Sequence, residues 1–269
     1  MARMAKGVAC AAALALCAFF AGGAQAASCG KTGAGFEAWK AEFADQARAS
    51  GVGKRGLAAL AKTSYATKTI AADRAIHKAF SGSVEEFMRR RGASAIISKG
   101  RSLKSANAAL FSNIQKRYGV PPGPLLAIWG METGFGSYMG NQNTLSAITT
   151  LAYDCRRPAF FEPHAIAALK LVDKGSLSSS SVGAMHGEVG HTQFLPGNVL
   201  KYGADGNGDG RINLRDKADA LASTANYLRG HGWRAGAGAQ ANLGAIAGWN
   251  AASVYQQAIA RIATAIDGE

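Results

Sequence analysis

The sequence is short of acidic residues. It contains 17 Asp and Glu against 30 Lys and Arg, so the formal net charge is +13 at pH 7. This imbalance suits an acidic polymer as the partner, and ordinary solubility is the alternative, between which composition does not choose. The sequence also lacks a recognisable nucleic-acid-binding motif, so we predict no nucleic-acid partner.

Long hydrophobic runs are absent as well. The longest run, residues 8–20, is shorter than the roughly 20 apolar residues that a membrane-spanning helix needs. It follows Arg3 and Lys6 and precedes Ala24-Gln25-Ala26, the small-x-small pattern that a signal peptidase cuts. We predict a signal peptide over residues 1–26, a mature domain over 27–269, export to the periplasm and no stable membrane insertion. An uncleaved anchor and a lipid on Cys29 are the alternatives.

Cysteine is scarce, with four in the chain. Cleavage of the signal peptide removes Cys10 and Cys17 and leaves Cys29 and Cys155. Two remaining cysteines usually pair in an oxidising compartment, although two separate thiols are the alternative. No C-x-x-C motif is present, and two cysteines alone cannot build a structural zinc site.

Strand signals are few, and helical periodicity dominates. Residues 54–100 give weak signals, and residues 176–181 and 234–240 are polar or glycine-rich loops. The predicted helices cover residues 36–50, 102–117, 144–152, 162–173, 217–230 and 252–266. A further helix is predicted to begin around Pro121–Pro124 and to stop at Gly134 and Gly136. The predicted fold class is therefore mainly α, in one catalytic domain.

The segment Pro121 to Gly140 ends an apolar helix on a carboxylate, Glu132. Large apolar side chains flank it: Trp129, Met131 and Phe135. Burial against such groups raises a carboxyl pKa, which is what a general acid requires. Gly134 and Gly136 are expected to let a sugar approach closely. The alternative is an exposed glutamate without a role.

A second polar segment runs from Gly183 to Asn198, where glycines alternate with polar side chains. Its backbone and amide groups, including Gln193, suit hydrogen bonding to acetamido sugars. His186 and His191 stand five residues apart around Glu188, which is not the zinc-protease arrangement. We predict structurally bonded or solvent-facing histidines rather than a metal site.

The third segment, residues 205–216, follows the pattern of a calcium loop, with Gly210 at the sharp turn. Its candidate ligands are Asp205, Asn207, Asp209, the carbonyl of Arg211 and Asp216. The closing position is Asp rather than Glu, which predicts modest affinity for a structural calcium ion. The alternative is an Asx-rich turn without an ion.

In this order, the segments resemble the lytic murein transglycosylase B family. The resemblance covers residues 30–266 and rests on an ordered set of motifs. These are Glu132-Thr133-Gly134-Phe135-Gly136, Gln193-Phe194-Leu195-Pro196, the calcium-type loop, Ala225-Asn226-Tyr227 and Gly232-Trp233. It implies a lysozyme-like fold with an additional N-terminal helical part. It also implies cleavage of the β-1,4 bond between N-acetylmuramic acid and N-acetylglucosamine in peptidoglycan, leaving a 1,6-anhydro end.

The resemblance also implies roles for single residues. Glu132 would be the acid and then the base, and no cofactor takes part in the chemistry. The residues implied to line the sugar subsites are Gln193, Tyr227, Trp249, Asn250 and Glu188. Trp249 stands where relatives often have Tyr, and Ala184 where they often have Ser, so one hydroxyl contact at each position is missing. Residues 153–157 resemble a subgroup with a paired N-terminal cysteine, which supports a Cys29–Cys155 bridge.

The sequence leaves three alternative functions open. A muramidase on the same fold would use water instead of the sugar's own hydroxyl. A non-catalytic peptidoglycan-binding protein would not need Glu132 in an intact motif. An exported calcium-binding protein is the third, although its single loop without a paired second hand argues against a sensor.

Overall fold

The computed structural model describes residues 28–75 and 80–268, so the predicted signal peptide lies outside the described residues. The predicted mainly α fold is confirmed, since helices form most of the described chain. No helix within these ranges has the length and apolar character needed to cross a membrane. The helices are α1 (Phe36–Ala49), α2 (Lys54–Ala61), α3 (Thr67–Ala75), α4 (Val84–Arg90), α5 (Ala93–Ala106), α6 (Ala108–Tyr118), α7 (Pro122–Thr133), α8 (Thr144–Tyr153), α9 (Pro158–Lys174), α10 (Pro196–Tyr202), α11 (Lys217–Gly230), α12 (Leu243–Trp249) and α13 (Ser253–Asp267).

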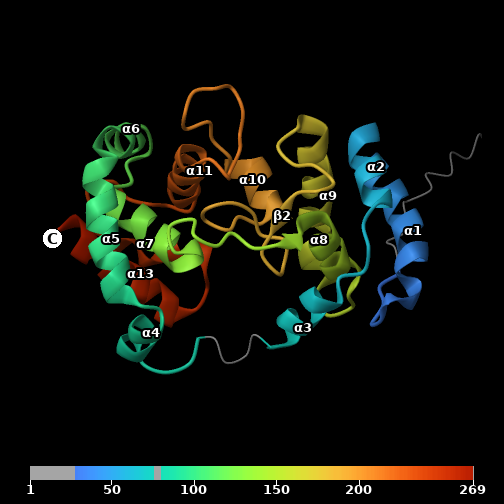
Figure 1. Ribbon diagram of the computed structural model, residues 1–269, viewed down its shortest axis with the longest axis horizontal. Helices are drawn as coiled ribbons and strands as arrows, with labels where there is room; N and C mark the ends of the chain where they lie inside the picture. The colour runs from blue at the N-terminus through green and yellow to red at the C-terminus, as the bar shows by residue number, and fades with distance from the viewer. Residues whose placement is uncertain (1–27, 76–79, 269) are drawn as a thin grey trace, which may run out of the picture.

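The helices gather around separate hydrophobic cores (Figure 1). One core belongs to α4–α7 and α11–α13, and the other to α1, α2, α8 and α9. The Gly-rich segment (residues 183–198) and α10 lie between them and contribute a third, smaller cluster around Phe194 and Tyr227. Antiparallel strands β1 (Gln142–Asn143) and β2 (Val182–Gly183) pair in the same region, with Gln142 opposite Gly183.

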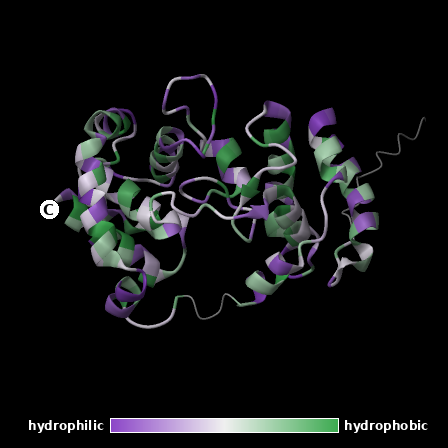
Figure 2. Cartoon of the chain, in the orientation of Figure 1, coloured by the Kyte–Doolittle hydropathy of each residue, from purple (hydrophilic) through white to green (hydrophobic). Residues whose placement is uncertain are grey.

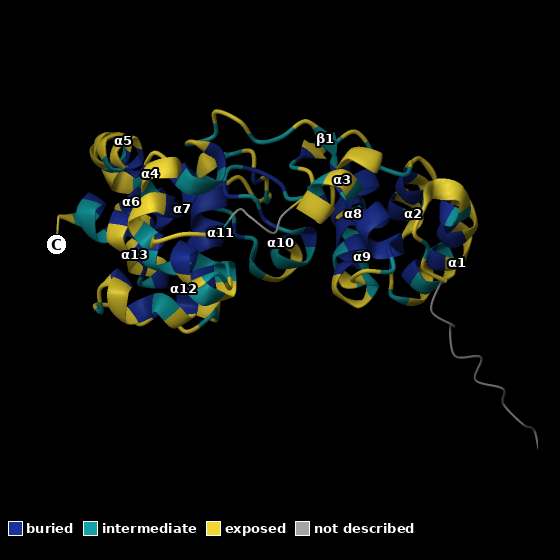
Figure 3. Ribbon diagram, turned by 90° about the horizontal axis from the view of Figure 1, so that it is seen from below, coloured by how far each residue is buried: buried dark blue, intermediate teal, exposed yellow. Residues whose placement is uncertain are grey.

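Helix α7 is buried on nearly every side, as its continuous apolar sequence predicts. It packs against α5 and α13, and Figure 3 shows it mostly dark blue. Pro122 occupies the first turn, where a missing N–H costs no hydrogen bond. Gly134 ends the helix with a left-handed φ of 56°. The predicted entry through the prolines and the predicted stop at Gly134 are thus confirmed, and Glu132 lies in the last turn.

The single helix predicted for residues 102–117 is wrong. The structure has two helices, α5 and α6, that meet at Asn107. The Asn107 backbone leaves the helical region (φ −124°, ψ 33°), and its side-chain amide donates to the Leu103 carbonyl. The Asn107 side chain thus gives a carbonyl at the end of α5 a hydrogen-bond partner, which allows the helix to stop there. Apolar spacing alone does not reveal such a break.

Short helices account for the other differences. Residues 54–100, which give weak sequence signals, contain α2, α3 and α4 and most of α5. Helices α10 and α12 have only seven residues each, too few for apolar periodicity to reveal them. The loop between α10 and α11 projects from the molecule and is largely hydrophilic (Figures 1 and 2).

The N-terminal part is tied to the rest of the chain by the predicted disulfide. Cys29 and Cys155 are bonded, which confirms the pairing. Gly30 extends the tie, because its N–H donates to the Tyr153 carbonyl at 3.0 Å. The Tyr153 hydroxyl donates to Thr32 at 2.9 Å. Residues 29–32 are thereby fixed to the end of α8.

Candidate active site

The six residues predicted for catalysis and sugar binding line a single pocket of about 390 Å³. They come from four separate stretches of the chain. Glu132 is on α7, Glu188 and Gln193 are on the Gly-rich segment, Tyr227 is on α11, and Trp249 and Asn250 are at the end of α12. The fold therefore brings together residues up to about half the chain apart.

Glu132 is half-buried and receives two hydrogen bonds on one oxygen, Oε1. The Tyr255 hydroxyl donates at 2.6 Å and the Trp249 indole N–H at 3.2 Å. Within the described residues, no hydrogen bond reaches Oε2. One face of the carboxyl is thus held by protein, and the other oxygen is left for a ligand in the pocket.

Burial raises the pKa of Glu132, and the charge of Glu188 adds to the rise. The hydrogen bonds from Tyr255 and Trp249 favour the ionised form and oppose it. Burial also raises the pKa of Tyr255, so its hydroxyl keeps the proton that it donates to Glu132. A carboxyl with a raised pKa can stay protonated closer to neutral pH, as a general acid must.

His191, on the Gly-rich segment, contacts helix α7, which carries Glu132. The Trp129 indole N–H donates to His191 Nδ1 at 3.1 Å, and the Thr133 hydroxyl donates to the His191 carbonyl at 2.6 Å. Because Nδ1 accepts, the neutral ring carries its proton on Nε2, which donates to the Arg215 carbonyl at 3.1 Å. Burial lowers the pKa of His191, in keeping with this neutral form. The prediction of a structurally bonded histidine is confirmed.

Gly136 has a different role from the one expected. A Cβ on Gly136 would lie 2.3 Å from His191 Nδ1, and the residue adopts a left-handed φ of 83°. The glycine therefore makes room for His191 rather than for a sugar. Gly134 is likewise explained by the helix end.

Gln193 is held in a strained conformation, with φ +57° in a non-glycine residue. Its side-chain amide N–H donates to the Gly190 carbonyl at 2.7 Å. The amide oxygen takes no part in this bond. Left-handed backbone at non-glycine positions is costly and tends to occur where function requires a side chain to be placed. The strain agrees with a polar contact to a ligand in the pocket.

Tyr227 and Trp249 form the aromatic wall of the pocket with Phe194. The Trp249 ring packs edge-on against Phe194 and Tyr227, each with centroids 5.0 Å away. The Tyr227 hydroxyl donates to the Gly248 carbonyl at 2.6 Å, and burial raises the pKa of Tyr227 to about 12. Tyr227 therefore stays neutral, and its oxygen can still accept a hydrogen bond.

Tyr255 is the main residue that the sequence analysis missed. It lies on α13, in a helix whose amphipathic pattern only predicts a core position, and it is buried. A buried Tyr hydroxyl needs a hydrogen-bond partner, and this rule is the one signal in the sequence. The contact between Trp249 and Glu132 was also not predicted.

The predicted calcium ligands lie together on the loop between α10 and α11. Asp205 accepts the backbone N–H groups of Gly208 and Gly210 at 2.6 and 2.8 Å. Asn207 and Asp209 likewise accept from their own loop, at 2.9 and 2.8 Å. No group of three or more acidic, histidine or cysteine side chains converges on a metal position in the described part of the chain.

Asp216 is turned away from that loop. Its carboxylate caps α11 by accepting from the Ala218 and Asp219 N–H groups at 2.7 and 3.3 Å. The buried Asp219 faces the loop instead, and accepts from Gly206 and Asn213. The donor set of the loop therefore fits calcium only in part, because its closing residue already serves the helix.

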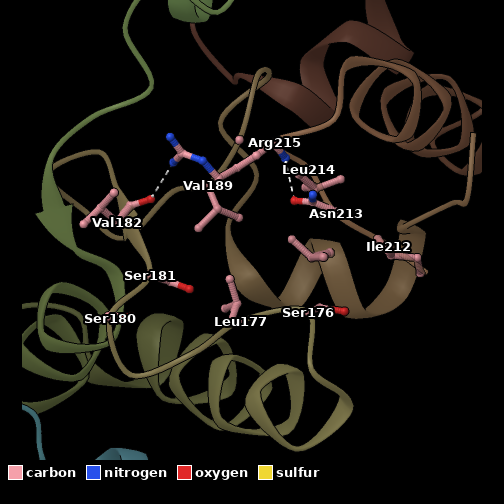
Figure 4. Close-up of a pocket in the computed structure, with 12 residues that line it drawn as sticks. Ser176, Leu177, Ser180, Ser181, Val182, Val189, Ile212, Asn213, Leu214 and Arg215 are labelled. Carbon is pink, nitrogen blue, oxygen red and sulfur yellow. Dashed lines mark hydrogen bonds between the residues drawn. The ribbon is translucent and has the colours of Figure 1, made fainter. Parts of the chain in front are cut away.

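A second pocket, of about 210 Å³, lies behind the Gly-rich segment (Figure 4). Arg215 crosses it and donates to the Val182 carbonyl at 3.4 Å. Val189 and Gly190 line this pocket, whereas their neighbours Glu188 and Gln193 line the first one. The Gly-rich segment thus forms a wall between two cavities, and none of the six predicted residues borders the second.

The family model of the transglycosylase SLT domain matches residues 35–243. The chain belongs to this family. Membrane-bound lytic murein transglycosylase B of Escherichia coli strain K12 is 38% identical to it over 118 residues, 43% of this chain and 33% of that protein. The match thus spans one third of the length of this curated relative.

Solved structures of similar fold support the lysozyme-like architecture. SltB3 from Pseudomonas aeruginosa, in complex with NAG-anhNAM-pentapeptide, has a TM-score of 0.79 at 27% identity, covering 87% of this chain and 80% of that one. The Escherichia coli lytic transglycosylase Slt35, in complex with calcium, has a TM-score of 0.73 at 20% identity, covering 85% and 92%. The second likeness concerns the fold alone.

Proposed function

We propose that the protein is a periplasmic peptidoglycan lytic transglycosylase. Its reaction is cleavage of the β-1,4 bond between N-acetylmuramic acid and N-acetylglucosamine, with formation of a 1,6-anhydro end. The observation that carries the proposal is Glu132, a carboxyl with a raised pKa and a free oxygen in a pocket of a transglycosylase-family fold. The basic chain suits a polymer that bears carboxylates.

Glu132 serves in two steps. Its carboxyl donates a proton to the glycosidic oxygen, and the bond from that oxygen to the muramic acid C1 breaks with the electron pair left on oxygen. The acetamido group of the sugar stabilises the cation that forms at C1. Glu132, now a carboxylate, then takes the proton of the C6 hydroxyl while O6 bonds to C1. No water is consumed, and Glu132 ends protonated.

Gln193, Tyr227 and Asn250 supply polar groups for the acetamido and hydroxyl groups of the strand. One carboxyl is enough for this route, because the attacking hydroxyl belongs to the substrate and needs no second base to activate water. Most glycosidases, by contrast, need two carboxylates, one as the acid and one as the nucleophile or base.

Counting reducing ends distinguishes the proposal from hydrolysis. Purified mature protein is incubated with sacculi, and soluble muropeptides and borohydride-reducible ends are both measured. We expect solubilisation without new reducible ends, because the anomeric carbon is closed in the anhydro ring. One new reducible end for each cleavage would show hydrolysis.

A hydrolytic muramidase is the second candidate, and one observation favours it. Glu188 places a second carboxylate in the same pocket as Glu132, as a base for water would require. A non-catalytic binding protein has no comparable support, since it would have no use for a proton donor held by Tyr255 and Trp249.

Tyr255→Phe is expected to move the alkaline limb of the pH–rate profile upward by about one pH unit. The Tyr255 hydroxyl favours the ionised form of Glu132, and a hydrogen bond to a charged group contributes about 1.5–3 kcal/mol. Without it the pKa of Glu132 rises further, so the acid stays protonated to higher pH. Turnover against pH on soluble glycan strands measures this. A limb that stays in place would show that Tyr255 does not act on the ionisation of Glu132.

Export rests on the signal peptide predicted for residues 1–26, outside the described residues. The Cys29–Cys155 disulfide supports an oxidising compartment. The same bond argues against the lipoprotein alternative, because a sulfur atom in a disulfide cannot also carry a thioether-linked lipid. We therefore propose a periplasmic location without an anchor on Cys29.

We propose that a calcium ion in the loop is structural. The His191 N–H donates to the Leu214 carbonyl at 2.9 Å, so the loop touches the Gly-rich wall of the pocket. Calcium is expected to raise the melting temperature, because it binds only the folded state. At a free calcium concentration one hundred times its Kd, the free energy of unfolding should rise by about 2.7 kcal/mol. Asp205→Asn should weaken that dependence. Identical melting curves in calcium and in chelator would show an ordinary turn.

A further inference from the structure

Glu188 is a second carboxylate that lines the same cavity as Glu132, and contacts with His186 hold it in place. Its side chain is 24% exposed. Glu188 Oε2 accepts the backbone N–H of His186 at 3.0 Å, and Oε1 lies 3.4 Å from His186 Nδ1. The tight turn at Gly187, with φ +86°, lets the chain fold back so that residues 186 and 188 meet. The carboxylate is therefore fixed in place rather than swinging freely in solvent.

His186 lies between two carboxylates. Its Nδ1 faces Glu188, and its Nε2 lies 3.9 Å from Asp73 Oδ1. Nε2 is buried and has no hydrogen-bond partner among the described residues. A neutral imidazole carries one N–H and can serve only one of these carboxylates, whereas the protonated ring can serve both.

Asp73 is the most firmly held of the three side chains Glu188, His186 and Asp73. It is almost fully buried on α3. Arg156 Nε donates to Asp73 Oδ2 at 2.6 Å, and Arg157 Nη2 donates to Oδ1 at 2.7 Å. Arg74 pairs with the same carboxylate at 2.9 Å. Burial alone would raise the pKa of Asp73, but the contacts with Arg156 and Arg157 outweigh it and lower the pKa.

We propose that Glu188 is a catalytic carboxylate whose negative charge faces the positive charge that develops on the cleaved sugar, and that His186 and Asp73 are its positioning residues. This inference rests on the proposed function, since it assigns a part in that reaction. A fixed charge aimed at a developing opposite charge stabilises a transition state without reorganisation. The proposal also assigns a role to the N-terminal helical part, because Asp73 on α3 contacts His186, which in turn contacts Glu188.

The same charge acts on Glu132 before cleavage. Burial comes first in raising the pKa of Glu132, and Glu188 raises it further. The hydrogen bonds from Tyr255 and Trp249, and the positive charge of Arg91, lower the pKa of Glu132. Removing the negative charge of Glu188 therefore favours ionised Glu132, which cannot donate a proton.

Glu188→Gln tests the proposal, because the amide oxygen can still accept the His186 N–H while the charge is lost. We expect turnover to fall about ten-fold or more. We also expect the alkaline limb to move downward by about half a pH unit or more, opposite in sign to Tyr255→Phe. Glu42→Gln, an exposed substitution on α1, is the matched control and should move neither quantity.

A double-mutant cycle tests the positioning role of His186. His186→Gln should lower turnover in the wild-type background and have little further effect once Glu188 is Gln, since it acts through that charge. Additive losses would show that His186 supports the fold independently, and would overturn its assignment.

The outcomes separate this inference from the proposed function. If wild-type protein solubilises sacculi into anhydro products but the limb stays in place in Glu188→Gln, Glu188 is merely a structural contact. A Glu188→Gln variant with full turnover would overturn the inference as well. If the wild type makes no anhydro products, the proposed function itself fails.

Discussion

Glu132→Gln is expected to lower turnover on sacculi by about 10²–10⁴-fold, the range ascribed to general acid catalysis. The amide keeps the shape of the side chain and an oxygen for Tyr255 and Trp249, but it has no acidic proton to donate. Because the same group would take the C6 proton in the proposed second step, both steps should fail together. Turnover is measured as release of soluble muropeptides.

The control must show that the variant still folds and binds. The melting temperature of Glu132→Gln should be at least as high as that of the wild type, because the amide is neutral and carries no charge that partial burial would disfavour. Sedimentation with sacculi should show retained binding. Clearing at a rate close to that of the wild type would remove Glu132 from the mechanism.

Loss of the Cys29–Cys155 bridge should have the largest effect on stability. The bond joins residues 126 apart in sequence, and closing so long a loop stabilises a fold by about 2–5 kcal/mol. We expect the Cys29→Ser, Cys155→Ser double variant to unfold at correspondingly lower denaturant concentration. The bridge lies beside Arg156 and Arg157, so pocket geometry should loosen as well.

Two measurements check this expectation. Protein exported to the periplasm and then denatured should show no free thiol in an Ellman titration. Reduced wild-type protein should unfold at the same denaturant concentration as the double variant. Two titratable thiols in the exported protein, or equal stability with and without the bridge, would contradict the structural role of the disulfide.

The sequence predicted the residues that line the pocket better than the residues that hold them in place from behind. Glu132, Gln193 and Tyr227 were found because each belongs to a short motif with its own chemistry, and the order of motifs singles out one family. The end of α7 was predictable because Pro122 and Gly134 act locally. The break at Asn107 was missed because a side-chain hydrogen bond decided it, not apolar spacing.

The residues behind the pocket carried no such signal. Tyr255 reads as one apolar position in a helix, and Asp73 as one charge in a weakly patterned stretch. Their roles depend on contacts across 123 residues for Tyr255 and Glu132, and 83 for Asp73 and Arg156. Contacts of that length come from tertiary packing, which local periodicity does not encode. At Gly136 the prediction of a close approach was right, but the group that approaches is His191 and not a sugar.

Digestion of sacculi in water labelled with heavy oxygen tests the reaction most directly. The muropeptides are separated and weighed by mass spectrometry, with Glu132→Gln as the blank. Attack by the C6 hydroxyl predicts muramic acid ends that are lighter by one water than the hydrolysed form and carry no label. Reducing ends that each contain one labelled oxygen would contradict the mechanism and make the protein a muramidase.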